Sequence, residues 1–426
     1  MAVKVAVLHG PGASAPLRDI ILACEDDYDP VFLVPREAGN RFTHLVSRMA
    51  RTVEVAGSGW LEAYRQSGAV CATTFDDRLI PALEEISDAI GLRGLTVGRN
   101  CWDKLVQREL LNSAGVSTVR VRAVSSLAEF DNARMQIGMA GILKPRRSSM
   151  GRGIRIVHAE EDSSQAWHEV SGEPADNEPC YIYEQLMDGV SPDGWLAPFV
   201  SVDTLSVGSE RLHFGLFDKL PLLRDFVETG DIGPSGLSSQ MKVQVLSVVE
   251  RALSALGVVD RVTHTEVRLT STGPQVLEVN GRLGGYVQGL CRALTGTNPV
   301  RMALAVAAGH APRVPALPDA SGRGRYVAAV QIPLDTSDPA VATKAIRALR
   351  ACTGVQAVET PDPVHESLRY AGAWLEAATR HQLIGAVVQA VDEVCRDPAI
   401  RGVLDTGWLA ALHRPSHSPA TPPEAG

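Results

Sequence analysis

Two glutamates constrain the fold of this chain more than any other feature. Glu266 and Glu278 each lie in an apolar run with a strand-like pattern, over 262–269 and 274–279. A short Ser/Thr/Gly segment, 270–273, separates the two runs as a turn would. The pattern predicts a β-hairpin that brings both carboxylates together on one face.

Polar and glycine residues follow the second glutamate. Asn280 comes two positions after Glu278, so a strand would direct both side chains to the same face. Carboxylate and amide oxygens are hard ligands that suit Mg²⁺. Arg282 adds a cation, and two glycines then free the backbone. The segment therefore predicts a site for phosphate-bound Mg²⁺, although the hairpin alone also fits a solvated surface turn.

Length, charge and cysteine usage exclude several classes of protein. A chain of 426 residues predicts two or three structural units. Its net charge of -8 disfavours a protein that grips nucleic acid or anionic lipid. The seven cysteines are scattered without a CxxC pair, which indicates a reducing compartment. No signal peptide or membrane-spanning run is evident, so we expect a cytoplasmic enzyme or binding protein.

The first ninety residues alternate between strand and helix patterns. This alternation predicts a parallel sheet covered by helices. Strands are expected at 3–8, 30–34 and 69–73, and helices at about 16–24 and 80–90. The turn His9–Gly12 follows the first strand, where it either faces a ligand or is a plain turn, since it does not match GxGxxG.

Two lysines stand out in the next part of the chain. A glycine-punctuated stretch, 91–98, precedes a predicted helix over 100–113 that carries Lys104 in its first turn. Lys144 lies in a short apolar strand, and a loop with hydroxyls and glycines leads to a second strand. This predicts a β-hairpin flap whose backbone N–H groups could cap phosphates. A solvated surface lysine and a mobile basic loop are the alternatives at these two places.

The remaining pattern predicts an antiparallel sheet followed by a smaller α/β unit. Strands are expected at 180–183, 196–205, 212–220, 326–332, 354–358 and 369–375, a loop at 226–238, and helices at 239–256, 300–308 and 380–395. Composition shifts and turn-rich stretches divide the chain into expected regions. These are an N-terminal α/β domain (1–98), a central flap domain (99–183), a core with the metal site (184–320), a C-terminal α/β subdomain (321–412) and a disordered tail (413–426).

These pieces, in this order, resemble the ATP-grasp superfamily from residue 1 to about 310. The pair His264 and Glu266, with the run from Glu278 to Gly285, is similar to the carboxylate–amine ligase branch, and in particular to L-amino-acid ligases that form dipeptides. The resemblance implies an α/β protein whose ATP-binding part is α+β. It implies an ATP-grasp fold with a parallel N-terminal domain, a flap subdomain, an antiparallel core sheet and a small C-terminal α/β domain.

The resemblance also implies roles for individual residues. Glu266, Glu278 and Asn280 would hold one or two Mg²⁺, with Mn²⁺ as an alternative. Arg282 and His264 would be catalytic, although a packed structural histidine is also possible at 264. ATP would contact Lys104, Lys144, Ser149, Met150, Gly151, Glu184, Gln185, Leu186 and Asp193. Substrate would contact Arg282, Gly284, Gly285 and Tyr286, the last of which could instead be a core aromatic.

Two departures from the family pattern are visible. The resemblance implies a hinge at Glu184-Gln185-Leu186 that holds the adenine. Many members place a glutamate for the ribose soon after the glycine that follows this hinge, here Gly189, whereas in this chain Asp193 would have to substitute. Asn280 is followed by Gly281 where proline is common, which leaves the metal ligands in place.

The implied reaction is ATP-dependent ligation. A substrate carboxylate takes the γ-phosphoryl group of ATP, and an amine attacks the resulting acyl phosphate to give an amide, ADP and phosphate. The resemblance implies small-molecule partners, a carboxylate and an amine, which in this branch are amino acids or peptides. It implies no nucleic-acid or membrane partner, and homodimers are common in such ligases. The alternatives are a fold relative that uses bicarbonate or a sugar amine, and a catalytically silent ATP-binding module.

Overall fold

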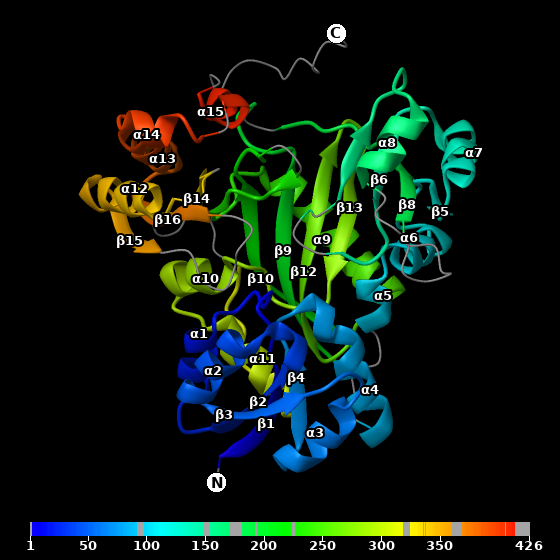
Figure 1. Ribbon diagram of the computed structural model, residues 1–426, viewed down its shortest axis with the longest axis vertical. Coiled ribbons are helices and arrows are strands. Elements are labelled where there is room, and N and C mark those ends of the chain that lie inside the picture. The colour runs from blue at the N-terminus through cyan, green and yellow to red at the C-terminus, as the bar shows by residue number, and fades with distance from the viewer. Residues whose placement is uncertain are drawn as a thin grey trace.

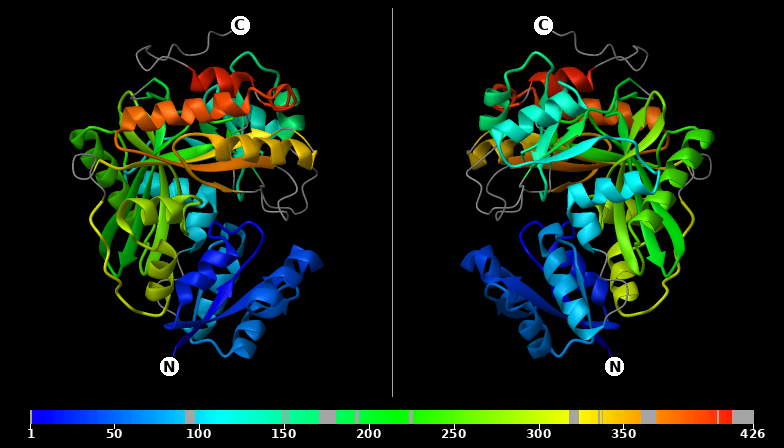
Figure 2. Two further views of the ribbon diagram at one scale, coloured as in Figure 1. Left: turned by 90° about the vertical axis from the view of Figure 1, so that its left-hand side faces the viewer. Right: turned by 90° about the vertical axis from the view of Figure 1, so that its right-hand side faces the viewer.

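The computed structural model contains three β-sheets with helices packed around them (Figure 1). It describes residues 2–91, 98–148, 151, 153–170, 181–191, 194–223, 226–317, 324–334, 336, 338–359, 369–404 and 406–413. The N-terminal sheet lies at one end of the molecule, and the other two sheets lie together at the opposite end (Figures 1 and 2). None of the helices in the described residues is long and apolar enough to cross a membrane.

The N-terminal sheet is parallel, as the sequence predicts. Its strands are β1 (Val3–Leu8), β2 (Tyr28–Pro35), β3 (Arg51–Val55) and β4 (Cys71–Thr74), in the order β3-β2-β1-β4. Its helices are α1 (Leu17–Cys24), α2 (Asn40–Met49), α3 (Trp60–Ser67) and α4 (Ile80–Ile90), with the short turns η1 (Arg36–Ala38) and η2 (Asp77–Leu79). Successive residues of β1 face opposite sides: Val5 and Val7 pack with α1 and α2, whereas Ala6 and Leu8 pack with α3 and α4. The sequence pattern predicts none of the elements from α2 to α3, because α2 is polar and β3 is a half-exposed edge strand.

The single helix predicted over 100–113 is wrong, because two helices occupy this stretch. They are α5 (Gly98–Trp102) and α6 (Lys104–Ser113). Asp103 lies between them with extended backbone angles, and its carboxylate accepts hydrogen bonds from the N–H groups of Leu105 and Val106. An aspartate that caps a helix in this way ends one helix and begins the next. Lys104 is consequently the first residue of α6.

A four-stranded antiparallel sheet forms the central part of the chain. Its strands are β5 (Val121–Val124), β6 (Gly141–Pro145), β7 (Arg155–Val157) and β8 (Tyr181–Gln185), in the order β5-β8-β6-β7. Two helices, α7 (Leu127–Ile137) and α8 (Ser163–Val170), cover it through a core around Phe130 and Tyr183. The pairing of Leu143 with Arg155 confirms the predicted β6–β7 hairpin.

The largest sheet has eight antiparallel strands and carries the predicted glutamate hairpin. The strands are β9 (Phe199–Val207), β10 (Glu210–Lys219), β11 (Gly230–Gly233), β12 (Arg261–Thr270), β13 (Gly273–Asn280), β14 (Tyr326–Leu334), β15 (Val355–Glu359) and β16 (Arg369–Ala377). Their order is β13-β12-β9-β10-β11-β14-β16-β15. The helices are α9 (Ser239–Ala255), α10 (Val287–Thr295), α11 (Pro299–Ala307), α12 (Pro339–Ala351), α13 (Arg380–Val394), α14 (Pro398–Arg401) and α15 (Thr406–Leu412).

Two features of this sheet differ from the simplest expectation. The stretch expected as a loop over 226–238 contains the short strand β11, whose two glycines give no strand signal. Through β11 the C-terminal strands β14, β16 and β15 join the core sheet, so the C-terminal region adds strands to it and packs α12 and α13 against them. The expected domain boundaries stay predictions. Residues 414–426 of the expected disordered tail lie outside the described residues.

Candidate active site

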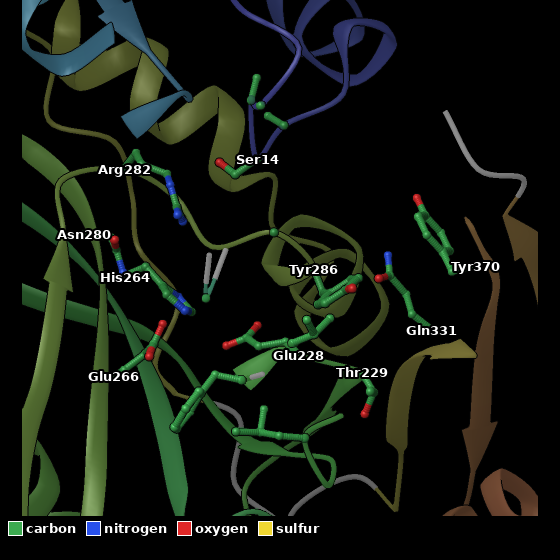
Figure 3. A pocket seen from close by; sticks show the side chains of 18 of the residues that line it. Ser14, Glu228, Thr229, His264, Glu266, Asn280, Arg282, Tyr286, Gln331 and Tyr370 are labelled. Carbon is green, nitrogen blue, oxygen red and sulfur yellow. The ribbon is translucent and has the colours of Figure 1, made fainter. Parts of the chain in front are cut away.

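A cavity of about 1710 Å³ lies where the three sheets meet. Its walls include the loop after β1, the start of α6, the β6–β7 hairpin and the ends of β12 and β13. The far wall comes from α10, β14 and β16. Figure 3 shows polar side chains from these elements directed toward a common space. Helix α9 covers one face of β12 and β13. The opposite face of these strands lines the cavity.

Two cross-strand residue pairs of the β12–β13 hairpin face the cavity. Glu266 pairs with Glu278, and His264 pairs with Asn280, in the β12–β13 register. All four side chains line the cavity, which confirms the predicted hairpin. Directly opposed residues have Cβ atoms only about 5 Å apart, and like charges so placed repel. Burial, then Glu228 and Glu278, raise the pKa of Glu266 to about 7.

Lys104 connects α6 to the hairpin and to the flap. Its ammonium lies 2.8 Å from Glu278 Oε1 and donates to the backbone carbonyl of Ser148 at 2.6 Å. The side chain is buried, so it is not the solvated surface lysine that the sequence left as an alternative.

Lys144 belongs to a buried cluster in the central sheet. Its ammonium lies 2.6 Å from Glu184 Oε2, and the guanidinium of Arg108 lies 2.5 Å from Glu184 Oε1. Burial alone would raise the pKa of Glu184, but Arg108 and Lys144 hold it at about 2. Arg108 also donates to the carbonyls of Val276 and Leu277, so the cluster attaches α6 to both β8 and β13.

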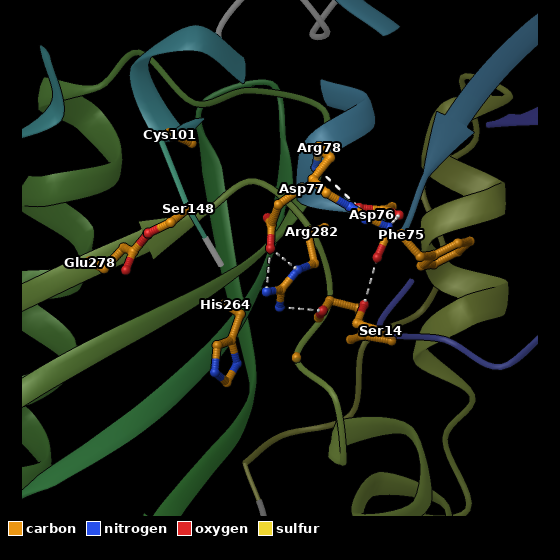
Figure 4. A network of polar contacts seen from close by, with 12 residues as sticks. Ser14, Phe75, Asp76, Asp77, Arg78, Cys101, Ser148, His264, Glu278 and Arg282 are labelled. Atoms are coloured by element: carbon orange, nitrogen blue, oxygen red, sulfur yellow. Dashed lines mark hydrogen bonds and ion pairs between the residues drawn. The ribbon is translucent and has the colours of Figure 1, made fainter. Parts of the chain in front are cut away.

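Arg282 forms an ion pair with the N-terminal domain (Figure 4). Its Nε donates to Asp77 Oδ2 at 2.8 Å, and Nη2 donates to the same oxygen. Its Nη1 donates to the carbonyl of Leu283 at 2.9 Å. Asp77 belongs to η2, so the arginine predicted to be catalytic is positioned by a residue 205 positions away in the chain. No local pattern points to Asp77, because an acid in a turn is usually solvated.

His264 is paired with the buried Asp203, which the sequence analysis does not include among the site residues. Its Nδ1 lies 3.0 Å from Asp203 Oδ1, and that oxygen also accepts from the N–H of Gly284 at 3.4 Å. Burial would lower the pKa of His264, but Asp203 raises it overall. An aspartate in the middle of the apolar strand β9 was the available signal.

Comparisons with known proteins agree with this geometry. A sequence model of the ATP-grasp domain matches residues 109–188. An L-amino acid ligase structure from Bacillus licheniformis superposes with a TM-score of 0.70 and 18% identity, over 92% of this chain and 97% of that one. Carboxyaminoimidazole ribonucleotide synthase from Aspergillus clavatus, complexed with ATP, superposes with a TM-score of 0.71 and 16% identity. The superposition covers 93% of this chain and 99% of that one. The protein has the ATP-grasp fold.

Curated proteins that are similar to this chain include ligases. Alanine–anticapsin ligase of Bacillus subtilis (strain 168) is 26% identical over 51% of this chain and 49% of its own length. Carnosine synthase 1 of Mus musculus is also 26% identical, over 49% of this chain and 26% of its own length. The chain thus spans about half the length, or less, of these relatives. The resemblance to the ATP-grasp carboxylate–amine ligases is confirmed.

The other predicted site residues are distributed unevenly around the cavity. Gly151, Leu186, Gly285 and Tyr286 line it. The side chain of Gln185 instead accepts a hydrogen bond from Arg120, and its backbone N–H donates to the carbonyl of Arg120. Ser149, Met150 and Asp193 lie outside the described residues, so their contacts with ATP stay predictions.

The donor set on the hairpin fits the metal that the fold implies. Two carboxylates and an amide oxygen face one cavity at a strand end, and hard oxygen ligands of this kind suit Mg²⁺. No group of three or more His, Cys, Asp or Glu suited to a metal occurs in the described part of the chain, so Asn280 would have to supply the third ligand. This assignment remains a prediction.

Gly284 offers a test of the packing beside His264. A Cβ added at Gly284 would overlap the imidazole of His264, whereas one added at Gly285 would meet nothing. We expect Gly284→Ala to lower the free energy of unfolding by about 1–3 kcal/mol, as overpacking does. Gly285→Ala is the matched control and should change it by less than about 0.5 kcal/mol. Urea unfolding followed by fluorescence measures both, and equal effects would contradict the contact with His264.

Proposed function

We propose that the protein is an ATP- and Mg²⁺-dependent ligase that joins a substrate carboxylate to an amine. The observation that carries this proposal is the opposed pair Glu266 and Glu278, facing the same cavity as Asn280, Arg282 and Lys104. The carboxylate would be activated as an acyl phosphate, with ADP and phosphate released as the amide forms. An amino acid or peptide is the proposed substrate class.

The residues of the chain would act mainly by positioning charge, as is usual in phosphoryl transfer. Lys104 and Lys144 would bind phosphate oxygens as point charges. Glu266, Glu278 and Asn280 would hold Mg²⁺, which supplies neutralisation of phosphate charge when bound. Arg282 would stabilise charge on the transferred phosphoryl group and then on the tetrahedral intermediate. His264, positioned by Asp203, would contact the substrate or accept the amine proton.

The relatives favour an amino-acid ligase over other reactions of this fold. Alanine–anticapsin ligase and the L-amino acid ligase are named as ligases of amino acids, and carnosine synthase 1 is named for making carnosine. A carboxylating enzyme is the second candidate, because carboxyaminoimidazole ribonucleotide synthase superposes equally well. The metal-site residues and Arg282 are all present, which disfavours a silent ATP-binding module. We also propose a cytoplasmic location, in keeping with the free cysteines of the described residues.

The test is ADP release from ATP and Mg²⁺ with a panel of amino acids, singly and in pairs, with mass spectrometry of the products. The expected product has the summed mass of two amino acids less one water. ADP release that requires bicarbonate, with no amino acid consumed, would instead establish the carboxylating enzyme. Tight ATP binding without turnover on either panel would contradict both.

A further inference from the structure

The outer edge of β13 is paired by side chains of a helix. β13 is the last strand of the eight-stranded sheet, and β12 pairs with its inner side. An edge strand presents a row of backbone N–H and C=O groups that have no strand partner. Helix α6 lies beside this edge (Figure 1), and its side chains form hydrogen bonds with the backbone of β13. The position of that backbone therefore depends on α6.

Gln107 of α6 forms two reciprocal hydrogen bonds with the backbone of Val279. Its Nε2 donates to the carbonyl of Val279 at 2.9 Å, and its Oε1 accepts from the N–H of Val279 at 2.8 Å. A side-chain amide can do this because it carries the donor and the acceptor of a peptide group side by side. Gln107 is 3% exposed, and its Nε2 also donates to the carbonyl of Cys101 at 3.1 Å. The side chain thus takes the place of a neighbouring strand at this residue.

Val279 lies between two of the proposed metal ligands. Its side chain packs in the core beneath α9, whereas Glu278 and Asn280 point to the other face of the strand and line the cavity. The N–H that Gln107 holds belongs to the peptide group between Glu278 and Val279. The carbonyl that it holds belongs to the peptide group between Val279 and Asn280. The two hydrogen bonds therefore fix the two peptide groups that separate the ligands.

Two other side chains on α6 contact the same strand. The ammonium of Lys104 lies 2.8 Å from Glu278 Oε1, and Arg108 donates to two further backbone carbonyls of β13. Residues three and four positions after Lys104 lie on the same face of a helix, which brings Gln107 and Arg108 to this strand as well. One face of α6 thus holds both the backbone of β13 and the carboxylate of Glu278.

We propose that Gln107 is a positioning residue that holds Glu278 and Asn280 in place for Mg²⁺. This inference rests on the proposed metal site and adds to it a buried residue from another element. Mg²⁺ demands a well-defined arrangement of its ligands, so ligands on a loosely held edge strand would bind it more weakly. Groups that orient metal ligands typically contribute about 10- to 100-fold to metal affinity.

The experiment measures metal binding directly, with Mn²⁺ and ADP as the probes. Electron paramagnetic resonance of free Mn²⁺, corrected for the Mn²⁺ that ADP holds in solution, gives the Mn²⁺ affinity of the ADP-bound protein. Calorimetry without metal gives the affinity for ADP alone. Gln107→Met keeps the length of the side chain and removes both hydrogen bonds to Val279. We expect its dissociation constant for Mn²⁺ to rise by about 10- to 100-fold, while that for ADP alone changes by less than about threefold.

Controls separate this inference from the proposed function. Gln66→Met is the matched control, because Gln66 is exposed on α3 and bonds to Glu62 of the same helix. Both of its dissociation constants should equal those of the wild type. Unchanged Mn²⁺ affinity in Gln107→Met would overturn the inference and leave the ligase function standing. Equal weakening of Mn²⁺ and ADP binding would also overturn it, since the residue would then support the fold in general.

The wild-type protein tests the metal site on which the inference rests. If the wild type binds ADP but no Mn²⁺ beyond what ADP itself holds, the proposed metal site and the ligase function are contradicted together.

Gln107→Asn provides a second variant if Gln107→Met does not fold. It keeps the amide and withdraws it from Val279 by one methylene. It should weaken Mn²⁺ binding selectively, by a smaller factor than the loss of both hydrogen bonds. Wild-type Mn²⁺ affinity in Gln107→Asn would count against the inference.

Discussion

Replacing Arg282 by glutamine should lower the rate of substrate-dependent ADP release by about 10²- to 10³-fold. The guanidinium faces the cavity beside the carboxylate pair, where phosphoryl charge would develop. A neutral amide of similar length cannot offset that charge. Steady-state ADP release measures the loss, and ATP affinity measured by calorimetry should change little, because the effect belongs to the transition state.

Two further variants show whether the loss comes from chemistry or from a broken ion pair. Asp77→Asn removes the partner of Arg282 but keeps the guanidinium, so we expect a much smaller loss of rate. Arg301→Gln removes an arginine that pairs with Glu25 and Asp27 away from the cavity, and its rate should equal that of the wild type. Equal losses in Asp77→Asn and Arg282→Gln would contradict a direct role for Arg282.

Replacing Glu184 by glutamine should lower the free energy of unfolding by about 3–5 kcal/mol. The substitution leaves the buried guanidinium of Arg108 and the ammonium of Lys144 without their shared carboxylate. These groups join α6 to the central sheet, so the loss should appear as a lower urea midpoint. Glu393→Gln breaks the exposed pair with Arg396 and is the control, with an expected change below about 1 kcal/mol.

The same cluster predicts a dependence of stability on pH. Arg108 and Lys144 hold the folded pKa of Glu184 at about 2, below its ordinary 4.5. A lowered folded pKa means that the stabilisation is fully present above pH 4.5 and is lost as the pH falls toward 2. We therefore expect the difference in stability between wild type and Glu184→Gln to shrink over that range. A difference that stays constant down to pH 2.5 would show that the carboxylate is not held ionised by its two partners.

The parts of the fold with local signals were predictable from the sequence. Apolar runs with a strand-like pattern identified β12 and β13, and the Ser/Thr/Gly turn identified their connection. The pairing of Glu266 with Glu278 depends on a β-bulge next to Glu266, because the register set by the turn alone would place Glu266 opposite Leu277. Amphipathic periodicity identified α9, and the structure shows Ser238 as its cap. The polar helix α2 and the glycine-rich strand β11 lacked such signals, because their positions depend on neighbours and not on their own composition.

The partners of the site residues were not predictable in this way. Asp77 and Asp203 lie far in sequence from Arg282 and His264. Asp77 lies in a turn, where an acid is usually solvated, and the apolar strand around Asp203 indicates a buried acid but does not identify its partner. Asp103 precedes Lys104 within the helix predicted over 100–113, and only the backbone angles show that it is a cap that divides α5 from α6. The buried pair of Lys219 and Asp231 likewise formed only when β10 and β11 came together.

The sequence by itself determined the chemistry available to this protein: the two carboxylates, the amide, the arginine and the two lysines, in an order typical of the ATP-grasp fold. Short-range pattern is enough for this, since strand alternation and turn residues act over a few positions. Only the tertiary structure decided which charges meet. Ion pairs such as Arg282 with Asp77 and Lys219 with Glu228 depend on desolvation and on contacts between distant elements, which no local pattern specifies.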